Sequence, residues 1–94
     1  MKNIYFTSLL FLIGCSSSVP DASIPLADHL KIGMDFLDQE KYVKAQEEFL
    51  FILSRGTGTD YGDDAQFFLA ESYFLNEQYI LSIKEYENLT RKMS

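Results

Sequence analysis

Apolar residues recur at helical intervals over most of the chain beyond residue 25. Between residues 63 and 89, Leu69 and Tyr73 lie on one such stripe, and a second stripe begins at Tyr79. Polar residues at 76–78 break the phase of the pattern between the two stripes. Because intervals of three and four residues place side chains on one face of an α-helix, this stretch predicts two short helices joined by a tight turn.

The upstream half of the chain carries a similar pattern. Leu26 begins a stripe that is apolar over a wide arc, which is typical of a helix with neighbours on more than one side. Polar residues at 38–41 predict a turn, and the stripe from Tyr42 to Ser54 predicts a second helix. Gly56 follows at a position suited to a left-handed cap that would close this helix.

The two halves match when one is shifted by 37 positions. Few residues are identical in this register, but the size of the side chain agrees at the matched packing positions, and size is what interlocking helices constrain. Small residues let two helix backbones approach, and aromatic residues fill the space beside the crossing. The predicted packing positions are Ile32, Gly33, Phe36, Tyr42, Ala45, Phe49 and Ile52 in the first half and Leu69, Ala70, Tyr73, Tyr79, Ser82, Ile83, Tyr86 and Leu89 in the second.

This order of bulky, small and aromatic residues resembles the tetratricopeptide repeat. The resemblance implies an all-α fold of two tandem tetratricopeptide-like helical hairpins, the start of a right-handed α-solenoid. We expect repeat 1 at residues 26–57 and repeat 2 at residues 63–94, joined by a connection at residues 58–62. The usual period of this unit is about 34 residues, so the excess is expected in the connection.

The segment 56–62 contains three glycines but lacks the Gly-Lys-Ser/Thr ending and the preceding strand of a phosphate-binding loop. The acidic residues at 60–64 lack the alternate oxygen ligands and the distal glutamate of a calcium loop. We therefore expect a flexible connection here. Either Asp63 or Asp64 is expected to cap the third helix by accepting hydrogen bonds from its free amides.

The first fourteen residues have the pattern of a secretory signal. Lys2 is followed by about ten mostly apolar residues at 4–13, which is too short to cross a bilayer core of about 30 Å as a helix. Residues 1–14 are therefore expected to form a signal peptide rather than a membrane span. Because a cysteine stands directly behind them, we expect the signal peptide of a lipoprotein.

The end of the apolar run resembles the bacterial lipobox. Its residues are Leu12, Ile13, Gly14 and Cys15. The resemblance implies that Cys15 is lipidated, for example with palmitate, and becomes the first residue of the mature protein; a buried or free cysteine behind an ordinary signal peptide is the alternative. Cys15 is the only cysteine, so neither an intrachain disulfide nor a cysteine zinc site can form. Two or more acyl chains hold a protein firmly at a membrane.

Small polar residues and two prolines make residues 15–25 a lipidated N-terminus and a flexible tether. Ser16 follows the cysteine, where an aspartate favours inner-membrane retention in enterobacterial lipoproteins. A serine at this position weakly favours the outer membrane, with the folded part on the periplasmic side. Ser16 alone does not decide between the two membranes, so the inner membrane stays the alternative.

Charge and residue type argue against several functions. The net charge is -6 and the eight basic residues do not cluster, so we expect no nucleic-acid partner. His29 is the sole histidine, and a packing or surface role outweighs a ligand role. The acidic runs Glu47–Glu48 and 85–87 are expected on solvated helix faces. We predict no enzyme activity, metal, cofactor or small-molecule substrate.

A surface then remains as the candidate site. In stacked helix pairs the first helix of each unit lines the concave side, where residues off the packing stripe meet a ligand. A groove of this kind suits an extended or helical peptide with spaced apolar anchors. Alternatively, a further repeat or the chain's own tail covers these residues. The predicted groove residues are Leu30, Met34, Leu37, Phe67, Glu71, Phe74 and Leu75, flanked by Asp38 and Asp64.

A lipobox, a short tether, the series Tyr42-x-x-Ala45-x-x-x-Phe49 and the run from Asp64 to Phe74 together resemble the BamD family of outer-membrane lipoproteins. The resemblance implies a scaffold subunit of the machinery that assembles β-barrel proteins into the outer membrane. Its expected partners are segments of unfolded outer-membrane proteins and other subunits of that machinery.

The chain departs from that family in two ways. Arg55 is followed by Gly56 and Thr57, where the family commonly has Arg-Tyr-Pro, and family members carry several more repeats. Repeat arrays generally need about three units for stability, so we expect an N-terminal portion of a longer protein. A coordinator of the Tol-Pal or cell-division type and a general tetratricopeptide lipoprotein of the envelope stay open as alternatives, each binding another periplasmic protein.

Overall fold

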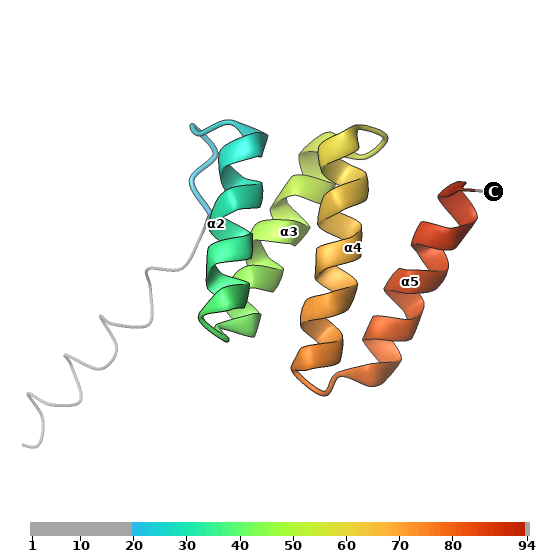
Figure 1. The fold of residues 1–94 in the computed structure, drawn as a ribbon. Coiled ribbons are helices and arrows are strands. Elements are labelled where there is room, and N and C mark those ends of the chain that lie inside the picture. Colours follow the sequence, from blue (N-terminus) through green and yellow to red (C-terminus); the bar gives the residue numbers. More distant parts are fainter. Residues whose placement is uncertain (1–19, 94) are drawn as a thin grey trace, which may run out of the picture.

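The computed structural model describes residues 20–93, which form four consecutive α-helices (Figure 1). Each helix packs against the next one along the chain, and α2 also contacts α4. The described residues contain no β-strand. The prediction of an all-α fold built from helical hairpins is therefore confirmed. The helices are α2 (Leu26–Asp38), α3 (Tyr42–Gly56), α4 (Asp60–Leu75) and α5 (Tyr79–Met93).

The turns of the two hairpins have the same geometry, 37 residues apart. Glu40 and Glu77 both adopt φ 61°, a left-handed backbone conformation that ends many helices. The amide of Lys41 donates to the Phe36 carbonyl at 2.9 Å, and that of Gln78 donates to the Tyr73 carbonyl at 2.8 Å. These bonds satisfy carbonyls at the helix ends that lack a helical partner. The register of the internal repeat is thus present in the backbone as well as in the side chains.

The connection between the hairpins differs from our predictions. The third helix begins at Asp60, and Thr59 caps it because its extended backbone lets the side chain accept from the Gly62 amide at 3.2 Å. The predicted caps Asp63 and Asp64 lie inside the helix and are exposed. The segment predicted as the connection is therefore shorter than expected, and only 57–59 separates the two helices.

Gly56 was predicted to cap the second helix, but it lies within α3. The glycine with positive φ is Gly58, at 89°. Gly56 is buried because α4 approaches it closely: a Cβ at Gly62 would overlap the Gly56 carbonyl oxygen. Glycine is needed at position 62 because the two helix backbones are in close contact there, and not because of a left-handed turn.

The core lies between α2, α3 and α4. Phe49 fills its centre, with no exposed surface, and its ring stacks on Phe68 at 5.9 Å between centroids. A Cβ added to Gly33 would lie 2.5 Å from the Phe49 ring, so the small residue of α2 makes room for the aromatic residue of α3, as the spacing predicts. The other core residues are Ala45, Ile52, Ala65 and Leu69.

The acidic residue Glu48 contradicts the expectation of a solvated face. It is buried at 9% exposure, and its carboxylate lies 2.6 Å from Nδ1 of the fully buried His29. The His29 ring also packs on Phe51, with centroids 4.4 Å apart, which confirms a packing role for the histidine. Glu48 is buried because α2 places a hydrogen-bonding partner against it.

The last part of the predicted tether, 20–25, lies against the first hairpin. The Asp21 carbonyl oxygen is 2.7 Å from Nε2 of His29, and this contact links the segment to α2. Ser23 donates to the Asp21 carboxylate through its amide at 2.9 Å and its hydroxyl at 2.7 Å, and these hydrogen bonds lower the pKa of that carboxyl. Residues 20–25 therefore have defined contacts with the first hairpin, and the flexibility of the tether stays a prediction.

Candidate functional site

The predicted groove residues occupy matching places on α2 and α4. Leu30 and Phe67 are 37 residues apart, and so are Leu37 and Phe74. Because α2 and α4 contact each other directly, the fold brings both sets onto neighbouring helices. We call the exposed apolar members of this set the α2/α4 face; they are Met34, Phe67, Phe74 and Leu75.

These four side chains are between 38% and 53% exposed, which is high for large apolar groups. Leu30 and Leu37 were predicted to meet a ligand, but they are partly buried and pack against the core cluster. Both leucines contribute to the first hairpin because α2 is apolar over a wide arc and turns part of it inward. The ligand-accessible part of the predicted groove is therefore mainly on α4.

Ring contacts hold the aromatic members of the α2/α4 face in place. The ring of Phe67 meets Phe68 edge to face at 5.3 Å and Tyr86 at 6.3 Å. Phe74 meets Tyr79 edge to face at 5.5 Å, across the turn between α4 and α5. Such contacts are favourable for aromatic rings and restrict their motion. An incoming peptide would therefore meet side chains that are already positioned.

Glu71, the polar member of the predicted groove, is engaged by α5. The hydroxyl of Tyr86 donates to a carboxylate oxygen of Glu71 at 2.6 Å. Burial, followed by this hydrogen bond and the negative charge of Glu71, raises the pKa of Tyr86 to about 12. The pair joins α4 to α5, and Glu71 is only partly exposed. Its carboxylate therefore contributes mainly to the contact between α4 and α5, and less to the predicted groove.

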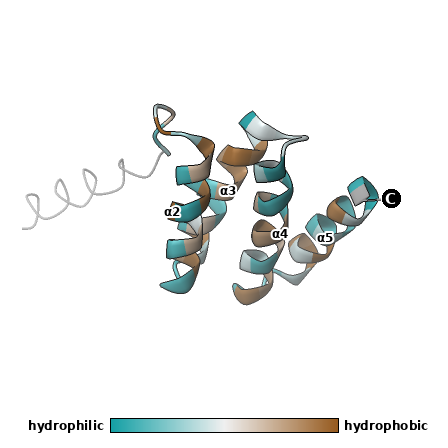
Figure 2. Ribbon diagram, turned by 45° about the horizontal axis from the view of Figure 1, so that its top comes forward, coloured by the Kyte–Doolittle hydropathy of each residue, from teal (hydrophilic) through white to brown (hydrophobic). Residues whose placement is uncertain are grey.

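Two predicted packing residues of α5 are exposed. Tyr79 is 50% and Ile83 is 57% exposed, whereas most of their predicted partners are buried or half-buried. The prediction is wrong for Ile83 because α5 packs on α4 alone among the described helices and its opposite side faces solvent. Tyr79 keeps a packing contact through the Phe74 ring. Figure 2 shows hydrophobic residues at the end of α4 and again on α5, on either side of the polar turn at 76–78.

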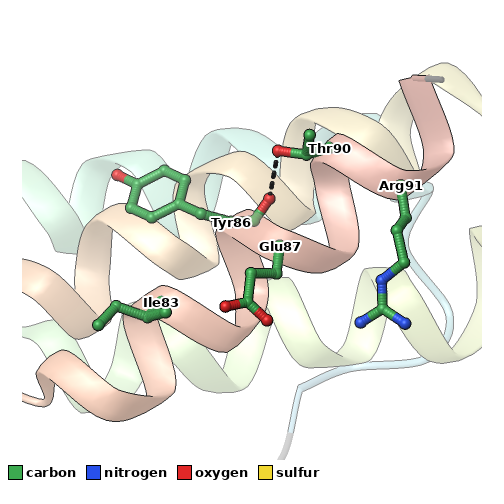
Figure 3. A pocket seen from close by; sticks show the side chains of 5 residues that line it. All are labelled: Ile83, Tyr86, Glu87, Thr90 and Arg91. Carbon is green, nitrogen blue, oxygen red and sulfur yellow. Dashed lines mark hydrogen bonds between the residues drawn. The ribbon is translucent and has the colours of Figure 1, made fainter.

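A shallow open hollow of about 460 Å³ lies along α5. Figure 3 shows the side chains that line it, with Thr90 donating to the Tyr86 carbonyl at 2.9 Å. The hollow is not among the sites that the sequence pattern predicts. One residue in the sequence could have indicated it. Ile83 is apolar, whereas the matching position of the first repeat, 37 residues earlier, is the polar Gln46. The lining residues are Ile83, Tyr86, Glu87, Thr90 and Arg91.

Within residues 20–93, no three histidine, cysteine, aspartate or glutamate side chains are grouped closely enough to hold a metal ion. The same part of the chain contains no helix with the length and apolar character needed to cross a bilayer. The predicted signal peptide, the lipobox-like residues and Cys15 lie outside the described residues. The lipid anchor therefore stays a prediction from the sequence pattern.

Comparisons with known proteins give no relative for this chain. No protein-family model matches it. No curated protein and no solved structure is significantly similar to it. The functional inference consequently depends on the residues and on the geometry of the helices, and the likeness to the BamD family stays a prediction from the sequence.

Proposed function

We propose that this protein is a non-catalytic scaffold lipoprotein that faces the periplasm from the outer membrane and binds unfolded segments of β-barrel proteins or subunits of their assembly machinery. The observation that carries this proposal is the α2/α4 face, whose four large apolar side chains lie on neighbouring helices and are between 38% and 53% exposed. Exposed apolar groups gathered on adjoining helices are a common feature of protein-binding surfaces.

The chemistry of the face suits an extended or helical polypeptide. Phe67 and Phe74 are seven residues apart, about two helical turns, so both rings can engage side chains spaced along one partner segment. Aromatic residues commonly contribute most of the binding energy at such interfaces. Met34 on α2 adds an unbranched side chain that adapts to different partners.

Strands of outer-membrane barrels alternate apolar and polar residues and carry aromatic girdles at both ends. Before they fold, these strands expose the apolar side chains that a face of this kind would bind. The lipobox cysteine would hold the scaffold beside the membrane in which the barrels are assembled. The resemblance to the BamD family supports the same location and the same class of partner.

Site-specific crosslinking in cells tests the proposal. A photoreactive amino acid at Phe74 should give adducts with nascent barrel proteins or with subunits of the assembly machinery. The same amino acid at Lys31, an exposed position whose side chain is 77% accessible, is the matched control and should give few of these adducts. Adducts with cell-wall or cell-division enzymes alone would reject the proposal and support the alternative of another envelope coordinator.

A further inference from the structure

Segment 20–25 precedes α2, lies beside it in Figure 1 and is mostly exposed. The two hydrogen bonds that Ser23 donates both go to Asp21, within the segment. The first-turn amides of α2 donate to the Pro25 carbonyl, as at any helix start. Among the described residues, the only side-chain hydrogen bond between this segment and the helices joins the Asp21 carbonyl to Nε2 of His29. The position of the segment therefore depends on one histidine.

His29 lies between two acceptors and needs a proton on each ring nitrogen to bind both. Nδ1 is 2.6 Å from a carboxylate oxygen of Glu48, and Nε2 is 2.7 Å from the Asp21 carbonyl oxygen. Because a carbonyl oxygen only accepts, Nε2 has to donate. A neutral imidazole carries one ring proton, so both contacts form only when the His29–Glu48 pair holds a second proton. Docking of segment 20–25 is therefore linked to that proton.

When the second proton is lost, the contact with Asp21 is the one that breaks. Hydrogen bonds to an ionised carboxylate are roughly twice as strong as neutral ones, so the remaining ring proton stays on Nδ1, facing Glu48. The lone pair of Nε2 then faces the lone pairs of the Asp21 carbonyl oxygen across 2.7 Å. His29 has no exposed surface, so water can reach Nε2 only when the segment moves away.

Charged groups approach His29 from two neighbouring elements. On α3, Glu48 contacts the ring directly, and the Arg55 guanidinium lies 5.1 Å from the centre of the Phe51 ring, which packs on the imidazole. In segment 20–25, hydrogen bonds from the neighbouring serine lower the pKa of the Asp21 carboxyl, so it stays ionised above pH 5. Among the described residues, α4 places no charged group in hydrogen-bonding or ring contact with His29.

We propose that segment 20–25 is a proton-dependent strap, which is docked on α2 while the His29–Glu48 pair holds its second proton and is released when that proton is lost. The matching position of the second repeat is Gln66, which does not titrate, so the strap belongs to the first hairpin. Released as extended chain, the segment spans up to about 20 Å and lengthens the tether between α2 and the predicted lipid anchor. That consequence rests on the proposed function, whereas release itself does not.

Nuclear magnetic resonance of the chain in phospholipid nanodiscs tests the proposal from about pH 5 to 9, a range that includes the ordinary titration of histidine. His29 is the sole histidine, so the nitrogen signals of its ring report its protonation directly. Relaxation of the half-buried Ile24 methyl groups reports whether the segment is docked. We expect the ratio of released to docked chain to rise by up to about tenfold per pH unit, because release is linked to one proton. The fully buried Ile52 is the internal control and should stay ordered.

Three variants separate His29 from other groups. His29→Gln copies the residue at the matching position of the second repeat and should abolish the pH dependence of Ile24 mobility, because glutamine does not titrate. Glu48→Gln should move release to lower pH, because the imidazolium loses the negative charge beside it. Asp21→Asn is the matched control. It removes the carboxylate but keeps the backbone carbonyl that faces His29, so release should occur in the same pH range.

Four results would overturn the proposal. The first is a ring that keeps both protons over the whole pH range. The second is loss of a ring proton while Ile24 stays as ordered as before. The third is the same release in His29→Gln, which would assign the effect to another group. The fourth is mobility of Ile52 that increases together with that of Ile24, because the hairpin would then be unfolding as a whole. None of these results bears on crosslinking at Phe74, so the proposed function is tested separately.

Discussion

His29 and Glu48 form a buried contact of 2.6 Å between Nδ1 of the imidazole and a carboxylate oxygen. The other ring nitrogen lies 2.7 Å from the Asp21 carbonyl, so acceptors face both nitrogens of His29. The arrangement is satisfied when both nitrogens donate. This single side chain thereby joins α2, α3 and the segment that precedes α2.

Replacing His29 by leucine should lower the free energy of unfolding by about 3 kcal/mol, because Glu48 would stay buried without its partner. Urea denaturation followed by circular dichroism measures the change. Glu48→Leu should also destabilise, and the double variant should lose less than the sum of the single losses. The exposed pair Lys31–Asp35, at 3.3 Å, is the control, since Lys31→Ala should cost below about 0.5 kcal/mol. Additive losses at His29 and Glu48 would show that the contact contributes no coupling.

Gln66 occupies the register position of His29 in the second repeat, but its Oε1 is buried and has no hydrogen-bond partner. Gln66→Met should therefore leave the free energy of unfolding unchanged or raise it by about 1 kcal/mol, because an unsatisfied acceptor is replaced by an apolar group of similar shape. Gln46→Met is the matched control and should destabilise by about 1 kcal/mol, since Gln46 donates to Gln78. A clear loss of stability on Gln66→Met would contradict the orphaned state of Oε1.

Tyr86 should make the protein less stable at high pH. Burial and the contact with Glu71 raise its pKa from 10.0 to about 12, so the folded state holds the phenolic proton more tightly than the unfolded state does. The contribution to stability is fully present below pH 10 and is lost as the pH rises through about 12. Denaturation midpoints between these pH values measure the loss. Tyr86→Phe should reduce the slope of stability against pH in this window, and an unchanged slope would contradict the assignment.

Gly62→Ala should destabilise the protein by about 1–3 kcal/mol, because the new Cβ would overlap the Gly56 carbonyl and separate α3 from α4. Alanine at an unhindered helical glycine would instead stabilise by about 1 kcal/mol, so the sign of the effect decides whether the close contact exists. Thermal unfolding measures it. Asp64→Ala, at an exposed site of the same helix, should change stability by about 0.5 kcal/mol or less.

Cys15→Ser should release the protein from the membrane fraction and abolish metabolic labelling by palmitate. Both effects follow if acyl chains on Cys15 supply the membrane affinity, because a serine cannot carry the thioether-linked lipid of the lipobox. Fractionation and mass spectrometry of the mature N-terminus measure the change. Unaltered membrane association of the serine variant would place the anchor elsewhere.

The sequence by itself determined the helices and the repeat register. Intervals of three and four residues define a helix face wherever it lies, and the agreement in size between Gly33 and Ala70, or between Phe49 and Tyr86, follows from packing rules that operate within one hairpin. Even the turn geometry at Glu40 and Glu77 repeats with the same spacing. These features are local, so they can be predicted from residues that are near in sequence.

The tertiary structure decided which of those faces are covered. Glu48 is buried because a histidine nineteen residues earlier lies against it, and Ile83 is exposed because no described helix packs on that side of α5. Near the start of α4, Gly62 is likewise buried because the fold places the Gly56 carbonyl against it. Periodicity specifies the direction in which a side chain points, but burial depends on the neighbour that the fold places there.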